Sequence, residues 1–122
     1  MTRIAVSSPR TLHASKFVGY ASRLDHPDYA PSVIAHIAAS PALKRASHLM
    51  WAYRTALRTG AHDGGEHGAG ARLERLLELR REQDVVVTVA RWYGGVKLGS
   101  ERWRCISDVA KQALDRLGPP KA

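Results

Sequence analysis

Six consecutive residues, Val85–Ala90 (Val-Val-Val-Thr-Val-Ala), are β-branched or apolar without interruption. Such a run is apolar on both faces of an extended chain, which predicts a buried strand at the centre of a sheet. A glycine-containing turn, Arg91–Ser100, follows it. Ser100 stands where a helix cap is expected, and Glu101–Leu117 has the apolar spacing of a helix with one face on a core. A strand, a turn and a helix are therefore expected in succession.

Earlier parts of the chain predict further strands. Ser15–Arg23 is rich in aromatic and β-branched residues, and the shorter Arg3–Ser8 can pair with it, with Pro9 and Arg10 in the turn. His48–Thr55 suits a second core strand, because its large residues alternate. In that strand Leu49, Trp51 and Tyr53 are expected to share one side.

Two helices and a loop complete the prediction. Asp28 is a suitable N-cap for a first helix, in which Pro31 is tolerated in the first turn. Gly60–Ala71 contains five glycines and is expected to be a loop. Arg72–Arg81 carries a leucine stripe typical of a helix. The element order predicts an α+β fold of two layers, a sheet with helices on one face.

Length and composition limit the possible classes of protein. At 122 residues the chain has room for one domain, residues 1–122. It lacks both a bilayer-spanning apolar segment and the apolar segment of a secretory signal, although a short transit peptide stays open as an alternative. The single cysteine, Cys105, excludes an internal disulfide and a cysteine-based zinc cluster. A cytoplasmic location is predicted, with no membrane partner and no disulfide partner.

The charge is strongly positive, with 19 Lys and Arg against 11 Asp and Glu, a net charge of +8. Most of the excess lies in residues 1–60, which hold eight basic side chains and two acidic ones, Asp25 and Asp28. Such an excess attracts polyanions, with RNA or an acidic protein surface as the expected partner. The alternative is a soluble surface with a cationic bias and no specific partner.

The segment Arg91–Gly99 (Arg-Trp-Tyr-Gly-Gly-Val-Lys-Leu-Gly) is a candidate anion site. Turns between a buried strand and a helix often present backbone N–H groups to an anion. Its glycines allow close backbone approach, and Arg91 and Lys97 supply positive charge. It is not a Walker A loop, because Lys97 comes two residues too early and Ser100-Glu101 follows Gly99. The alternative is a purely structural turn, with Trp92 and Tyr93 packed under the sheet.

The loop His62-Asp-Gly-Gly-Glu-His67 offers potential metal ligands or an acid/base pair. The spacing of Asp63 and Glu66 matches no known zinc pattern, so a solvated loop, or carboxylates that accept backbone N–H bonds, is favoured. Cys105 is predicted to be an inert thiol on the far side of the apolar stripe from Trp103. No catalytic residue, no metal and no cofactor are expected.

Three blocks of the sequence resemble the IMPACT family. They are Ala46-Ser-His-Leu-Met-Trp-Ala-Tyr-Arg54, then Asp63-Gly-Gly-Glu66 followed by Gly68-Ala-Gly-Ala-Arg-Leu73, and finally Arg91–Gly99. The match extends from about residue 15 to residue 117, and the last block is more similar to the eukaryotic branch. The chain departs from the family pattern at three positions. Gly64 stands in place of an aspartate, Ala71 in place of a glycine and Leu49 in place of an asparagine.

The resemblance implies a fold shared with GHMP kinases, a domain of a small-subunit ribosomal protein and domain IV of elongation factor G. Eukaryotic members restrain a starvation-sensing kinase by competing for its activator, and some bind monomeric actin. They carry an RWD domain, for which these 122 residues have no room. The resemblance therefore leaves contact with RNA, the ribosome or actin as the expected role, and makes direct copying of the kinase-regulator role doubtful.

Three functions follow from this sequence. The first is a non-catalytic binding module in translation control that contacts RNA or the ribosome. The second is a protein-interaction regulator that binds actin or a component of the starvation-response kinase pathway. The third is a phosphate-handling enzyme that uses Asp63, Glu66 and Arg91. The residues expected to bind an anion or partner are Arg91, Gly94, Gly95, Lys97, Gly99, Arg54 and Arg72, beside the family-motif loop residues His48, Asp63 and Glu66.

Overall fold

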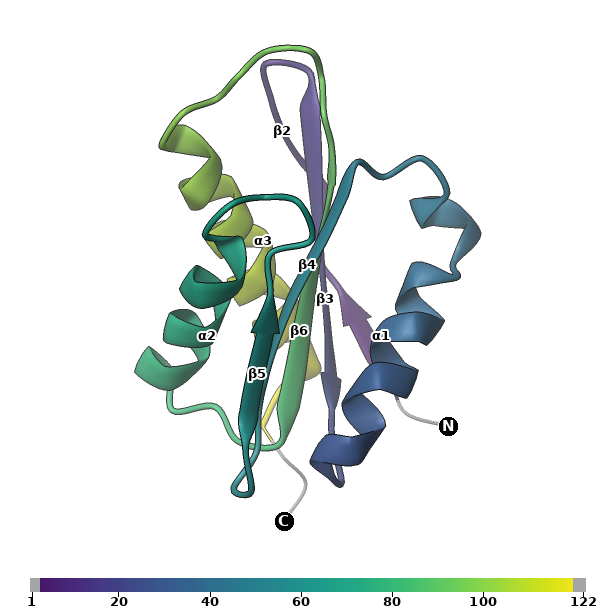
Figure 1. Cartoon of the computed structure of the whole chain (residues 1–122), viewed down its shortest axis with the longest axis vertical. Coiled ribbons are helices and arrows are strands. Elements are labelled where there is room, and N and C mark those ends of the chain that lie inside the picture. Colours follow the sequence, from purple (N-terminus) through teal and green to yellow (C-terminus); the bar gives the residue numbers. More distant parts are fainter. Residues whose placement is uncertain (1–2, 120–122) are drawn as a thin grey trace.

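The computed structural model describes residues 3–119. Its elements are β1 (Ile4–Val6), β2 (Arg10–Leu12), β3 (Ser15–Arg23), a 3-10 turn (Pro27–Tyr29), α1 (Ala30–Ala38), a second 3-10 turn (Pro41–Leu43), β4 (His48–Arg54), β5 (Thr59–His62), α2 (Ala69–Leu79), β6 (Val85–Trp92) and α3 (Glu101–Leu117). The strands form one antiparallel sheet in the order β1-β3-β6-β4-β5, and β2 also pairs with β3 (Figure 1).

The strand β6 lies at the centre of the sheet, as the sequence predicts for Val85–Ala90. It pairs with β3 on one side and with β4 on the other, and all its residues up to Arg91 are buried. The strand β6 ends at Trp92, two residues beyond the predicted end at Ala90. Its valines serve both faces of the sheet, because strand side chains alternate. Val87 and Val89 enter the main core, whereas Val86 packs in a separate cluster with Ala30.

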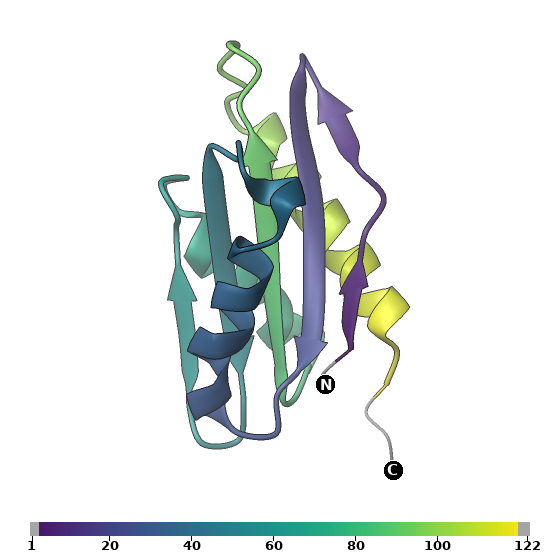
Figure 2. The same ribbon diagram turned by 90° about the vertical axis from the view of Figure 1, so that its right-hand side faces the viewer.

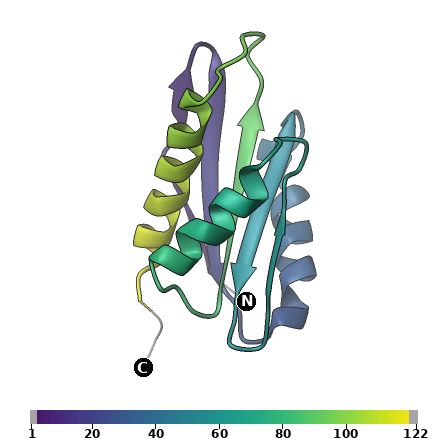
Figure 3. The same ribbon diagram turned by 60° about the vertical axis from the view of Figure 1, so that its left-hand side comes forward.

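The main core lies between the sheet and the two helices α2 and α3, which cover the same face (Figures 1 and 3). From α2 the leucines at 73, 76 and 77 point inward, and α3 contributes seven buried residues. The approach of α3 to β3 is very close. A Cβ atom at Gly19 would lie 2.3 Å from the carbonyl oxygen of Val109 in α3. Glycine at this position therefore determines how closely helix and sheet pack.

The expected α+β class, an antiparallel sheet with helices packed on it, is confirmed. The detail that all helices share one face is wrong, because α1 lies on the opposite face from α2 and α3 (Figures 1 and 2). There Ile37 and Leu43 pack on Val18 and Tyr20 of β3. The physical reason is the central sheet itself, since strands that are apolar on both faces need cover on both.

In the strand β4 the residues Leu49, Trp51 and Tyr53 share one side, as predicted, and that side faces α1. Met50 and Ala52 fill the main core, whereas the larger residues at 49, 51 and 53 are only half-buried on the α1 side. Alternation identifies two sets of side chains but does not say which set faces the thicker layer. The side of β4 that packs against α2 carries the unbranched Met50 and the small Ala52.

Several local boundaries also differ from the prediction. Arg10 begins β2 and does not lie in a turn; the chain reverses instead at His13 and Ala14, which both have positive φ. The predicted loop from residue 60 to 71 contains the end of β5 and the start of α2. Tyr29, and not Asp28, is the N-cap of α1, because a 3-10 turn precedes that helix. Ser100 precedes α3, but its hydroxyl makes no capping hydrogen bond.

No helix within residues 3–119 is both long enough and apolar enough to cross a membrane.

Candidate functional site

A buried ion pair between Glu66 and Arg91 lies at the centre of the site. Glu66 is in the loop between β5 and α2 and is 5% exposed; Arg91, near the end of β6, is 4% exposed. The Nη1 group of Arg91 donates to both carboxylate oxygens of Glu66, each at 2.8 Å. The Nε atom of Arg102, in the first turn of α3, lies 2.8 Å from Oε1 of the same carboxylate. One carboxylate therefore balances two guanidinium groups.

The ion pair connects elements that are far apart in the sequence. The Nη2 group of Arg91 donates to Oγ of Ser15 at the start of β3, and the same hydroxyl accepts the backbone N–H of Gly94 at 3.1 Å. His48 begins β4 directly opposite Arg91 in the sheet register. Its Nε2 atom lies 3.7 Å from Oε2 of Glu66. The charged pair thus holds the ends of three strands to the glycine-rich loop.

A pocket of about 260 Å³ opens beside this pair. Three cationic side chains and one carboxylate line it, which gives a net charge of +2 with a neutral histidine. The lining residues are His48, Gly65, Glu66, Arg91, Tyr93, Lys97, Leu98, Gly99 and Arg102. Tyr93, in the turn that begins after β6, is 47% exposed. The pocket is therefore suited to an anion that carries a planar group.

A second cationic feature adjoins the pocket on the helix side. Two guanidinium groups pack on the ring of Trp103, that of Arg72 at 4.2 Å and that of Arg102 at 4.3 Å from the ring centre. This stacking orients Arg102, whose Nε meets Glu66. Trp103 therefore acts as a positioning residue for the charged pair.

Asp63 has a structural role in this conformation. Its two carboxylate oxygens accept the backbone N–H groups of Gly68 at 3.0 Å and Gly70 at 2.8 Å, at the beginning of α2. These hydrogen bonds, together with the nearby His67 and His62, hold the pKa of Asp63 below its usual value. The predicted alternative of a carboxylate that accepts backbone N–H bonds describes Asp63, whereas Glu66 pairs with side chains.

Replacing Asp63 with asparagine is expected to remove part of the acid sensitivity of the fold. Because the pKa of the folded state lies below that of the unfolded state, ionised Asp63 stabilises the fold above about pH 4, and this contribution disappears as the pH falls through the folded pKa. The urea midpoint of the variant should lie below that of the wild type at neutral pH and converge with it in acid. A constant difference between the two proteins across this range would contradict the prediction.

The structure brings most of the predicted site residues together. Arg91, Lys97, Gly99, His48 and Glu66 all line the same pocket, and Gly94 reaches it through Ser15. Arg72 adjoins it by stacking on Trp103.

Two predicted residues lie elsewhere. Arg54 pairs with Val85 at the far end of β4, six residues and about 20 Å from the position of His48. There its guanidinium donates to the carbonyl of Leu77. Gly95 lies in the turn after β6 with positive φ and open space around it. Neither residue lines the pocket.

Arg102 is the site residue that sequence reasoning missed. Its signal was present, since it lies three residues after Gly99, in the first turn of the predicted helix. Cys105 was also placed wrongly: it is completely buried in the main core beside Ile106. The apolar stripe of α3 is centred on Ile106 and Val109, while Trp103 lies at its margin and is only partly buried.

The departure at Gly64 has a local explanation. The residue has a φ of +59°, and a Cβ atom there would lie 1.9 Å from the carbonyl oxygen of Leu49. The loop presses against the backbone of β4, and only glycine fits this conformation without displacement. Within the described residues, His, Cys, Asp and Glu side chains form no group of three or more that could hold a metal ion.

The fold and the site define a class: an α+β domain in which one end of the sheet carries a buried carboxylate between two arginines, below a cationic pocket. The model of the Impact N-terminal domain matches residues 13–114. The chain belongs to the IMPACT family.

Two relatives illustrate the extent of the similarity. Protein IMPACT homolog from Saccharomyces cerevisiae is 30% identical over 118 residues, which cover 92% of this chain and 46% of the relative. Protein IMPACT from Bos taurus is 33% identical over 112 residues, which cover 87% of this chain and 35% of the relative. The chain thus spans less than half the length of these relatives.

Two solved structures share the architecture. The two-domain translational regulator Yih1 has a TM-score of 0.64 and 28% sequence identity, over 93% of this chain and 46% of that one. A crystal structure of a hypothetical protein has a TM-score of 0.79 at 19% identity, over 95% of this chain and 62% of that one. The second similarity concerns the fold alone.

Proposed function

We propose that this chain is a non-catalytic binding module in translation control, which contacts RNA on the ribosome through the end of the sheet that carries the cationic pocket. The role in translation is supported by similarity to a structure described as a translational regulator. The surface is supported by one observation above all: three cationic side chains and a single, already paired carboxylate line the pocket.

Further cations lie on segments near this end of the sheet. Lys16 at the start of β3 lies over the ring of Trp92 at 4.2 Å, and Arg104 is exposed on α3. Lys44 and Arg45 are exposed in the segment that leads into His48. Phosphate groups of RNA are bound by such clusters through Coulomb attraction and counterion release. The exposed ring of Tyr93 supplies a surface on which a base can stack.

The state of the two carboxylates supports binding and not catalysis. Both oxygens of Glu66 accept hydrogen bonds from Arg91, and both oxygens of Asp63 accept backbone N–H groups. A general base needs a free oxygen within reach of a substrate proton. Carboxylates that point into solvent, away from Arg91, would argue against the phosphate-handling enzyme. Glu66 is directed toward Arg91 and not into solvent, so its orientation does not supply that argument.

Replacing Lys97 with glutamate is expected to weaken co-sedimentation with ribosomes about ten-fold at low salt, because the variant loses a phosphate contact and adds a like charge. Binding of the wild type should itself fall steeply from low to moderate salt. The matched control is Lys111→Glu, which makes the same charge change at an exposed position on α3. It should retain most of the binding.

Two outcomes would contradict the proposal. Wild-type protein that stays in the supernatant at both salt concentrations would exclude a ribosome or RNA contact of useful strength. The other outcome is a partner that is still pulled down after nuclease digestion, together with an equal loss of ribosome binding in the Lys97→Glu and Lys111→Glu variants. It would favour a protein-interaction regulator that binds actin or a component of the kinase pathway.

A further inference from the structure

The strand β5 forms one border of the sheet, and no other segment of the described chain pairs with its outer edge (Figures 2 and 3). A border strand directs the N–H and C=O groups of every second residue outward, which makes it a template for another strand. Proteins usually protect such edges with lysine, proline or a bulge. The sequence of β5, Thr-Gly-Ala-His, contains neither lysine nor proline.

On the α1 side of this edge lies an apolar hollow of about 370 Å³, between α1 and the face of β4. Pro31 and Ile34 line it from the helix, and Trp51 and Tyr53 line it from the strand. The ring of Trp51 is stacked between those of Tyr53, at 6.0 Å, and His62 of β5, at 5.7 Å. The three rings form a row that leads from the hollow to β5.

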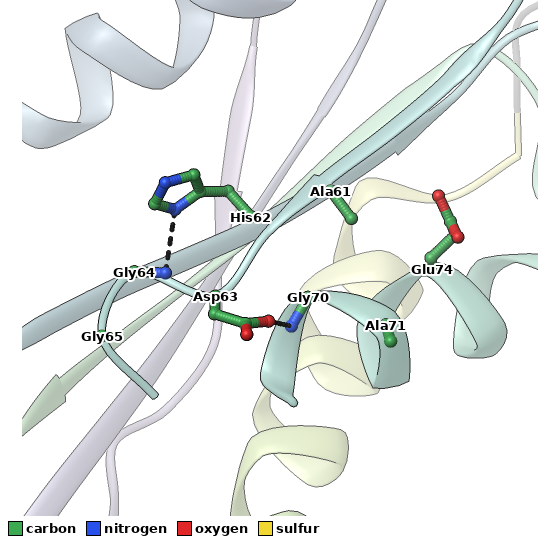
Figure 4. Close-up of a pocket in the computed structure, with 8 residues that line it drawn as sticks. All are labelled: Ala61, His62, Asp63, Gly64, Gly65, Gly70, Ala71 and Glu74. Atoms are coloured by element: carbon green, nitrogen blue, oxygen red, sulfur yellow. Dashed lines mark hydrogen bonds between the residues drawn. The ribbon is translucent and has the colours of Figure 1, made fainter. Parts of the chain in front are cut away.

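On the α2 side lies a second, shallow hollow of about 580 Å³ (Figure 4). Small residues of β5 and α2 leave this space open, namely Ala61, Gly70 and Ala71. Two carboxylates, Asp63 and Glu74, face it. Glu74 makes no ion pair or hydrogen bond with the residues between 3 and 119, and the bonds to Asp63 keep that group ionised. In a chain with a net charge of +8, this is a locally acidic hollow.

We propose that β5 is a docking edge for an extended peptide segment of a partner protein. The segment adds to the sheet as a strand beside β5. Because strand side chains alternate between faces, one set enters the apolar hollow on the α1 side and the other set enters the acidic hollow on the α2 side. The segment recognised is therefore one in which large apolar residues alternate with lysine or arginine.

Charge and size distinguish this occupant from others. RNA is disfavoured because its phosphates would face Asp63 and Glu74. A second copy of β5 is disfavoured because its sequence, Thr-Gly-Ala-His, has no lysine or arginine for the acidic hollow and no large aliphatic residue for the apolar one. The α2-side hollow meets the cationic pocket only at Gly65, which lines both, and the peptide proposal does not depend on the RNA contact.

The test uses the peptide acetyl-Val-Lys-Phe-Lys-Val-Lys-amide and the whole chain. A second peptide of the same composition, acetyl-Val-Val-Phe-Lys-Lys-Lys-amide, lacks the alternation. Titration followed by amide NMR and hydrogen exchange should show that the alternating peptide perturbs residues 59–62 and slows their exchange at least five-fold. The second peptide should bind these residues at least five times more weakly.

Charge reversal at Glu74 tests the assigned face. Glu74→Lys should weaken binding of the lysine peptide about five-fold. The same variant should bind a peptide with glutamate in place of lysine more tightly than the wild type does. Glu78→Lys makes the same change one turn along α2, outside the hollow, and should have little effect. Trp51→Ala, checked for an intact fold by its NMR spectrum, should weaken binding of the lysine peptide to the wild-type background and of the glutamate peptide to the Glu74→Lys background.

Three results would overturn the proposal. One is peptide binding that leaves the exchange of the β5 amides unchanged. Another is an equal loss of affinity in the Glu74 and Glu78 variants. The third is protection of β5 that increases with protein concentration without peptide, which would assign the edge to self-association.

Discussion

Glu66→Gln is expected to lower the free energy of unfolding by about 3–5 kcal/mol, the cost of a buried charge that loses its partner. Arg91 is 4% exposed, and its Nη1 group donates hydrogen bonds to both carboxylate oxygens of Glu66. With a neutral amide at position 66, the guanidinium stays in the interior without a compensating charge. Urea unfolding at neutral pH measures the difference.

The control for this variant is Glu78→Gln. Glu78 forms an exposed ion pair with Arg75 on α2, and such pairs contribute about 0–1 kcal/mol. The double variant Glu66→Gln with Arg91→Met removes the unpaired charge as well and should recover part of the lost stability. If Glu66→Gln unfolds within about 1 kcal/mol of the wild type, the pair does not have the structural role assigned to it.

Gly19→Ala is expected to have the second largest effect, a loss of about 3 kcal/mol. The added Cβ would lie 2.3 Å from the backbone carbonyl oxygen of Val109, and a backbone atom cannot move aside by a change of rotamer. α3 must therefore shift away from β3 and loosen contacts along the main core. Thermal or urea unfolding tests the stability, and amide NMR shifts along α3 report the displacement.

Gly99→Ala is the matched control. It introduces the same methyl group where no other atom lies within 4 Å, so it costs only what a positive φ costs a residue with a Cβ, about 1 kcal/mol. Equal destabilisation by the two substitutions would show that the close contact of α3 with β3 does not limit stability.

The main elements were predictable because they depend on local patterns. The strand Ser15–Arg23 and the helix Glu101–Leu117 have the predicted bounds, and the run from Val85 forms the central strand. Errors arose where one pattern allows two placements. The alternation in β4 did not indicate which side meets α2, and Cys105, which was expected beyond the apolar stripe of α3, is buried in it beside Ile106.

The run Val85–Ala90 by itself determined a central buried strand, and the three sequence blocks determined the family, because both are properties of consecutive residues. Only the tertiary structure decided the rest. Sheet register places His48 beside Arg91 and puts Arg54 at the far end, while the glycine loop brings Glu66 between two arginines. These contacts join residues from 25 to 43 positions apart, and no local periodicity encodes such a distance.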